Sequence, residues 1–190
     1  MERPGDTRAI RVWLRQNGVE ISDRGRIPSD LMEKYERAHG IEPIPDDLGR
    51  ALPLLPHHRD GALVVRTDFR DDEAWRAVVA TAGAPTRDGF QAYVLTCEDR
   101  AFAGLTPGRL MAHLPTRHRH RVLFVADAMT MENPEHPLIA LSVDEYESPG
   151  DVLRAVPSAV QAISDNLDIA NMRFHDFVLQ ADPDGVLRLY

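Results

Sequence analysis

Cysteine is almost absent from this chain of 190 residues, and long apolar runs are absent altogether. Cys97 stands alone, which excludes a disulfide within the chain and favours a reducing cytoplasm, where a lone cysteine usually packs as a small apolar side chain. No apolar stretch approaches the roughly 18 residues that a membrane span requires. None follows the charged start of the chain, as a signal peptide would need. We therefore expect a cytoplasmic protein with no membrane partner.

Signatures of common catalytic and metal sites are missing as well. The sequence has no nucleophile elbow, no phosphate-binding glycine-rich loop, no dinucleotide fingerprint and no zinc-ligand spacing. His118 and His120 could share one face of a strand, but the arginines around them oppose metal binding and favour a basic turn, either solvated or paired with acids. Three acids follow predicted strands, where they could hold Mg²⁺ or simply end the strands: Asp68, Asp127 and Asp144. We predict no catalytic residue, no cofactor and no metal, and hence no enzyme.

Positive charge is scarcer than negative charge, and it is unevenly spread. The sequence has 22 basic residues, of which Lys34 is the only lysine, and 30 acidic residues, which gives a net charge of −8. Residues 1–40 carry eight basic and seven acidic side chains, whereas residues 41–190 carry fourteen and twenty-three, a balance of −9. Because an acidic surface repels phosphate, electrostatics permits contact with nucleic acid at the N-terminal end and disfavours it elsewhere.

Proline density divides the chain into three parts. Residues 41–60 hold Pro43, Pro45, Pro53 and Pro56, and prolines at this spacing interrupt helices and strand ladders. We interpret this segment as a semi-rigid linker. It separates a small module, residues 1–40, from a larger domain, residues 61–190.

The small module shows two helical patterns around an arginine-containing loop. In the first helix, Ile10, Trp13 and Leu14 fall on one face, and Gly18 can end the helix. The second helix starts at Pro28 or Ser29, ends at Gly40 and shares one apolar face: Leu31, Tyr35 and Ala38. Between the helices, three apolar residues can pack beneath them: Val19, Ile21 and Ile27. The pattern predicts a helix–loop–helix with Arg24, Gly25 and Arg26 exposed.

The larger domain alternates between strand and helix patterns. We predict strands over residues 63–69, 91–96, 121–126, 138–143 and 185–190, and helices over residues 72–82, 106–114, 157–165 and 170–181. The connection between the third and fourth strands is too short for a crossover helix, so these two strands should pair antiparallel. This order is typical of an α/β (α+β) fold with a mixed sheet and flanking helices.

The chemistry of Arg24-Gly25-Arg26 suits a narrow DNA groove. The minor groove of A·T-rich DNA is narrow and strongly negative, and a planar, weakly hydrated guanidinium enters it at a lower desolvation cost than an ammonium. Gly25 has no side chain to hinder close approach of the backbone to the groove floor. Such contacts distinguish A·T from G·C pairs rather than a base order. Three arginines of the first helix can add phosphate contacts: Arg8, Arg11 and Arg15.

Residues 8–39 resemble the DNA-binding domain of the actinobacterial H-NS-like (Lsr-type) nucleoid proteins. The resemblance lies in the Ile10…Trp13 helix, Asn17-Gly18, the run Arg24-Gly25-Arg26-Ile27-Pro28 and the Tyr35 helix. It implies binding of A·T-rich double-stranded DNA, with Arg24, Gly25 and Arg26 in the minor groove. Residues 61–190 resemble an uncharacterised domain family of actinobacteria through four segments: Val64–Phe69, Phe124–Asp127, His136-Pro137-Leu138 and Asn166…Asn171-Met172.

Together these features predict a nucleoid-associated DNA-binding accessory or regulatory protein. One small module with two minor-groove arginines binds weakly, so we expect the larger domain to form a homo-oligomer or to bind a protein partner. An alternative of another class is a protein-interaction or immunity-type module, in which the acidic domain sequesters a basic partner.

Overall fold

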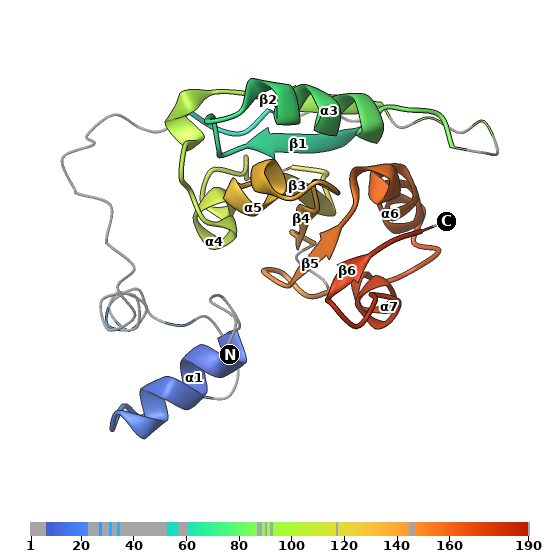
Figure 1. Cartoon of the computed structure of the whole chain (residues 1–190). Coiled ribbons are helices and arrows are strands. Elements are labelled where there is room, and N and C mark those ends of the chain that lie inside the picture. The colour runs from blue at the N-terminus through green and yellow to red at the C-terminus, as the bar shows by residue number, and fades with distance from the viewer. Residues whose placement is uncertain are drawn as a thin grey trace. The chain divides into compact units, whose positions relative to one another are not determined.

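Two compact units make up the chain, residues 1–51 and residues 52–190 (Figure 1). The computed structural model describes residues 7–22, 27, 31, 34, 53–56, 61–86, 89, 91, 93–116, 118–144 and 147–189. Each unit has apolar cores of its own. No helix in the described ranges is long and apolar enough to cross a membrane.

The small unit is built on helix α1 (Thr7–Gln16). Its core contains Ile10, Leu14 and Ile27, and four further apolar side chains pack against them: Trp13, Val19, Ile21 and Leu31. Leu31 and Lys34, the described residues of the second predicted helix, are both helical. The apolar face of the first helix and the residues predicted to pack beneath it are therefore confirmed.

Gly18 ends helix α1, as predicted. Its φ of 76° lies in the left-handed region, which glycine adopts without the steric penalty of a Cβ. The Gly18 amide donates to the Arg15 carbonyl at 3.0 Å, and the Val19 amide donates to the Leu14 carbonyl at 2.9 Å. This pair of bonds satisfies carbonyls that a helix end leaves open, and it brings Val19 back onto the core.

The larger unit contains a six-stranded mixed sheet. In spatial order its strands are β2 (Val94–Cys97), β1 (Ala62–Arg66), β3 (Val122–Ala126), β4 (Leu138–Ser142), β5 (Val152–Ala155) and β6 (Val186–Leu187). Strand β4 is antiparallel to both of its neighbours, and all other pairs are parallel. The predicted α/β fold with a mixed sheet, and the antiparallel pairing of β3 with β4, are confirmed.

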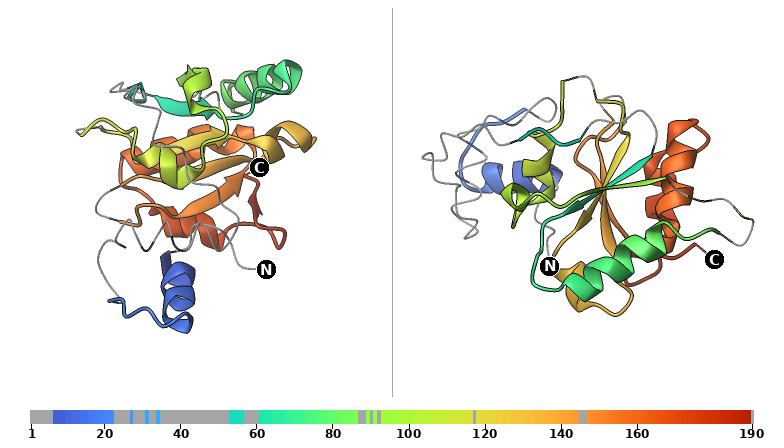
Figure 2. Two further views of the ribbon diagram at one scale, coloured as in Figure 1. Left: turned by 90° about the vertical axis from the view of Figure 1, so that its left-hand side faces the viewer. Right: turned by 90° about the horizontal axis from the view of Figure 1, so that it is seen from above.

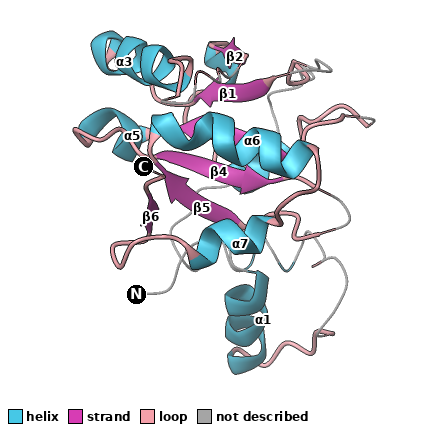
Figure 3. Cartoon of the chain, turned by 90° about the vertical axis from the view of Figure 1, so that its right-hand side faces the viewer, coloured by secondary structure: helices cyan, strands magenta, loops and turns pink. Residues whose placement is uncertain are grey.

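Helices cover both faces of this sheet (Figures 2 and 3). One face packs against α3 (Asp72–Ala82), α6 (Val160–Asp168) and α7 (Phe174–Leu179). The other face packs against the short helices η1 (Arg100–Phe102) and α4 (Pro107–Met111). Along β1, Val64 joins the first core while Leu63 and Val65 join the second, because successive strand residues point to opposite faces.

Three described elements of the larger unit were not predicted. They are strand β5, the short helix η1, and helix α5 (Ala128–Glu132), which lies in the short connection between β3 and β4. Asp127 starts α5, since its carboxylate accepts from the Thr130 amide while the Thr130 hydroxyl accepts from the Asp127 amide. The predicted boundaries also shift: the first strand ends at Arg66 rather than residue 69, and the last helix spans Phe174–Leu179 rather than residues 170–181.

Part of the segment expected to be a linker belongs to the larger unit. Leu55 is only 2% exposed in the core beside α4, and its amide donates to the His113 carbonyl at 2.8 Å. Residues 53–56 therefore pack with the α/β unit, while residues 41–52 and 57–60 lie outside the described residues.

Candidate nucleic-acid interface

Two arginines of α1 hold the chain segment that leads to Arg24-Gly25-Arg26. The Nε atom of Arg11 donates to the Ser22 carbonyl at 3.0 Å, and the Nη2 atom of Arg15 donates to the Ile21 carbonyl at 3.1 Å. The two arginines are one helical turn apart, so they lie on the same side of α1. They therefore fix the backbone of residues 21 and 22 against the helix.

The segment that follows the tripeptide is also anchored. Ile27 is 6% exposed and packs in the small core with Ile10 and Leu14. Anchored residues thus stand on both sides of residues 23–26. Arg24, Gly25 and Arg26 lie outside the described residues, and so does the side chain of Arg8.

Sequence reasoning found Arg11 and Arg15 but gave them another role. They were predicted to contact phosphate, and that remains a prediction. Their bonds to the Ile21 and Ser22 carbonyls were not predicted, although the four-residue spacing placed both side chains on one side of the helix. A guanidinium has five N–H donors, so a bond to a carbonyl leaves donors for a second acceptor.

In the larger unit, each of the three candidate aspartates pairs with an arginine. Asp68 pairs with Arg70 at 2.7 Å, and Asp144 pairs with Arg121 at 2.5 Å. The carboxylate of Asp127 accepts from both terminal nitrogens of Arg154, at 2.8 and 2.5 Å.

Position in the sheet separates these aspartates. Asp68 and Asp127 follow the parallel strands β1 and β3, so they lie at the carboxyl ends of these strands. Asp144 follows the antiparallel strand β4 and therefore lies at the opposite end of the strands. Within the described ranges, no group of three or more His, Cys, Asp or Glu side chains is placed to hold a metal ion.

The paired arginines determine how these carboxylates titrate. The hydrogen bond from Arg70 is the main reason that the pKa of Asp68 is lowered. For Asp127, burial acts to raise the pKa, but the hydrogen bonds and charge of Arg154 outweigh it, so the pKa is lowered. Both groups are held as carboxylates, the form that an ion pair within the domain requires.

Backbone hydrogen bonds join the two strand ends at the place where an open α/β sheet usually binds a ligand. That place is the carboxyl edge between two strands whose connections leave in opposite directions, here β1 and β3. The amides of Thr67 and Asp68 both donate to the Ala126 carbonyl, at 2.9 and 3.2 Å, and the Thr67 hydroxyl does so at 3.2 Å. Backbone therefore bridges the two strand ends.

A cavity of about 310 Å³ lies further along the same edge, and its charged group is already engaged. Arg188 in its wall binds Glu135, Asp182 and Asp184 at 2.6–2.8 Å. These hydrogen bonds, with Glu135 first, raise the pKa of Arg188 above its ordinary value. The nearby His136 holds the Thr130 carbonyl through Nδ1 at 2.9 Å. Arg188, Glu135 and His136, three polar residues of the cavity wall, thus bind groups of the same unit.

Among the described residues, His118, His120 and His175 form no metal site either. His120 is 8% exposed, its Nε2 atom lies 3.3 Å from the Pro56 carbonyl, and its ring stacks on that of His118. The interpretation as a solvated turn is therefore wrong for His120, which fastens residues 53–56 to the domain, whereas the expected acid pairing is found for the neighbouring Arg121. His175 is exposed on α7. Cys97 is buried, as predicted.

Two protein-family models match the chain, one within each of its two units. Residues 2–38 match the family described as Lsr2 DNA-binding domain, and the match includes α1, the Gly18 turn and Arg24-Gly25-Arg26. This match supports a DNA-binding role for the small unit. No solved structure matches the chain. Residues 61–190, more than half of the chain, match the family described as Domain of unknown function (DUF6924), and the chain belongs to that family.

Proposed function

We propose that this protein binds A·T-rich double-stranded DNA by placing Arg24 and Arg26 in the minor groove, as a nucleoid-associated accessory or regulatory protein. The observation that carries the proposal is the match of residues 2–38 to a DNA-binding domain. The anchored residues on both sides of the tripeptide, Ser22 and Ile27, support it, because they limit how far the ends of so short a segment can move.

The residue types of the tripeptide fit this task. Two guanidinium groups separated by one glycine can extend along a narrow groove while the backbone stays near its floor. The contact would read the width and the A·T content of the groove, not a base order. In this proposal Arg8, Arg11 and Arg15 add positive charge beside the loop and reach phosphates on its flank.

The larger unit contributes self-association rather than a DNA surface. Its arginines Arg66, Arg70, Arg121, Arg154 and Arg188 are all bound to acids of the same unit. These pairs reduce the positive charge that the unit offers to phosphate and the negative charge that it offers to a basic partner. Joining two small units raises the affinity for DNA by avidity, up to roughly 10²- to 10⁴-fold where the geometry allows both to bind.

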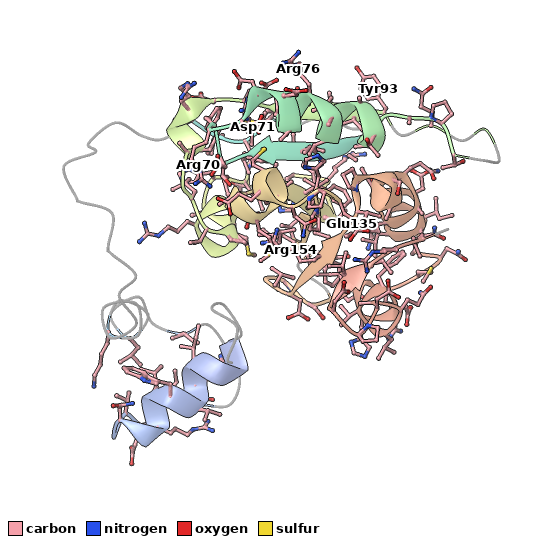
Figure 4. All side chains as sticks on the ribbon, viewed as in Figure 1. Arg70, Asp71, Arg76, Tyr93, Glu135 and Arg154 are labelled. Carbon is pink, nitrogen blue, oxygen red and sulfur yellow. The ribbon has the colours of Figure 1, made fainter. Side chains whose placement is uncertain are left out.

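The test is a titration of the full chain into labelled A·T-rich and G·C-rich duplexes at two salt concentrations, followed by fluorescence anisotropy. We expect tighter binding to the A·T-rich duplex, and a loss of about 1–3 kcal/mol for Arg24→Ala or Arg26→Ala. Arg76→Ala is the matched control, because it removes one exposed arginine from α3 of the larger unit (Figure 4). Equal, negligible binding to both duplexes would refute the proposal.

A further inference from the structure

We propose that two copies of this protein join through strand β2, edge to edge and antiparallel, so that the two sheets become continuous. The inference names the surface for the self-association proposed above and rests on that proposal. Strand β2 ends the sheet on one side, and Tyr93 just before it is 68% exposed, pointing outward (Figure 4).

The backbone hydrogen bonds between β1 and β2 determine which N–H and C=O groups of β2 point away from the sheet. The Ala62 amide donates to the Tyr93 carbonyl at 2.9 Å, and Leu63 lies opposite Leu95. In a parallel pair only alternate residues bond to the neighbouring strand, so Leu95 bonds inward while Val94 and Thr96 direct their N–H and C=O groups outward. Within the described part of the chain, no hydrogen bond reaches these four groups.

The edge lacks the devices that usually prevent strand pairing. Natural edge strands carry charges, proline or a bulge, which keep other chains away. Residues 91–97 contain no charged residue and no proline, and they include several strand-forming residues. The other end of the sheet differs: β6 has only two residues and is followed by Arg188 with its three carboxylates.

The register of a two-fold pair follows from the outward groups. With Val94 opposite Thr96 of the second copy, and Thr96 opposite its Val94, the four outward groups of each copy are all satisfied in four hydrogen bonds. Leu95 then faces Leu95 of the second copy across the axis. No charged residue falls within the paired residues 93–97, although the chain has a net charge of −8.

The lack of charge at residues 93–97 favours a second copy of the chain as the partner. Two-fold symmetry places identical surfaces against each other, so a charged edge would repel its own copy, whereas an uncharged one does not. A basic or an acidic partner gains no ion pair at residues 93–97. The edge therefore fits a second copy of this chain.

The first experiment measures the mass of the full chain in solution by sedimentation equilibrium, without DNA. We expect twice 21.3 kDa for the unchanged protein and a monomer for Thr96→Pro. Proline at residue 96 removes an outward N–H and leaves the inward bonds in place, and proline is tolerated at edge strands. Thr96→Val is the matched control and should remain a dimer. A monomeric unchanged protein, or a Thr96→Pro dimer of undiminished stability, would overturn the inference.

A second experiment tests the register and does not depend on the folding of the proline variant. In a Cys97→Ala background, Leu95→Cys should form a disulfide-linked dimer, because directly opposed non-hydrogen-bonded residues have Cα atoms about 4.5 Å apart. Thr96→Cys is the control and should cross-link at least tenfold more slowly, since the two cysteines are diagonal across the axis. Equal cross-linking of both variants, or of neither, contradicts the register.

These outcomes separate the inference from the DNA-binding proposal. A protein that prefers A·T-rich DNA but stays monomeric overturns the β2 interface and leaves DNA binding intact. A dimer that ignores both duplexes overturns DNA binding and leaves the interface intact.

Discussion

Replacing Arg11 distinguishes two roles that one arginine can have at a DNA-binding surface. The Nε atom of Arg11 donates a hydrogen bond to the carbonyl of Ser22, which lies just before the proposed DNA-binding loop. If this bond positions the loop, Arg11→Gln should weaken binding to A·T-rich DNA more than binding to G·C-rich DNA. If Arg11 only contacts phosphate, the variant should weaken binding to both duplexes equally.

The size of the effect follows from the bond. Hydrogen bonds that involve a charged group contribute about 1.5–3 kcal/mol in protected sites. Arg11 is partly exposed, so water can replace part of the interaction. We therefore expect a loss of about 1 kcal/mol, close to fivefold in affinity, for the A·T-rich duplex. Loss of a phosphate contact has another signature, a slope of log affinity against log salt concentration that is less negative by about 0.9.

The assay is anisotropy titration at four salt concentrations with both duplexes. Arg11→Lys is the informative control, because it keeps the positive charge but lacks the Nε donor and the planar fork of arginine. We expect Arg11→Lys to behave like Arg11→Gln in A·T preference and like the unchanged protein in salt slope. Full retention of A·T preference in Arg11→Gln, together with a less negative slope, would refute the positioning role.

Three further predictions concern the larger unit. Gly61→Ala should destabilise the protein by roughly 2–4 kcal/mol, because φ is 117° and the new Cβ would lie 2.4 Å from the Tyr93 carbonyl oxygen. Gly108→Ala in α4, where the space is open, should be neutral or stabilising, as thermal unfolding of both variants will show. The lowered pKa of Asp127 means that its stabilisation is complete above the unfolded-state pKa of about 3.9 and is lost as pH falls through the folded value. Asp127→Asn should thus cost about 2 kcal/mol in urea unfolding at pH 7 and far less near pH 3; an equal cost at both would contradict this. Burial raises the pKa of the Cys97 thiol, so a disulfide reagent should modify it slowly in the native protein and rapidly in urea, and rapid native reaction would contradict its burial.

The small unit was largely predictable because its structure is determined locally. The apolar face of α1 follows from residues three and four apart, and the helix end follows from the freedom of Gly18 to adopt a positive φ. The bonds from Arg11 and Arg15 could not be predicted in the same way. They depend on how closely residues 21 and 22 return to the helix, and spacing does not encode this distance.

Strand β5 was not predicted because it has only four residues and its one charged residue is paired with an acid that is distant in the sequence. Arg154 sits in the middle of four residues and would mark an exposed position, yet it binds Asp127, which is distant in sequence. Nearby turn residues were the available signal: Gly150, with a φ of 95°, donates to the Ser142 carbonyl and closes the hairpin between β4 and β5. The DNA-contacting role of Arg24 and Arg26 remains a prediction.

The bridge from Thr67 and Asp68 to Ala126 has a thermodynamic consequence. A sheet whose crevice holds a cofactor gains stability by mass action, and it loses that stability when the cofactor is scarce. Here the hydrogen bonds that join the ends of β1 and β3 are made by the chain itself, so they do not depend on the concentration of a ligand. The junction of β1 and β3 is stabilised by its own chain under all metabolic conditions.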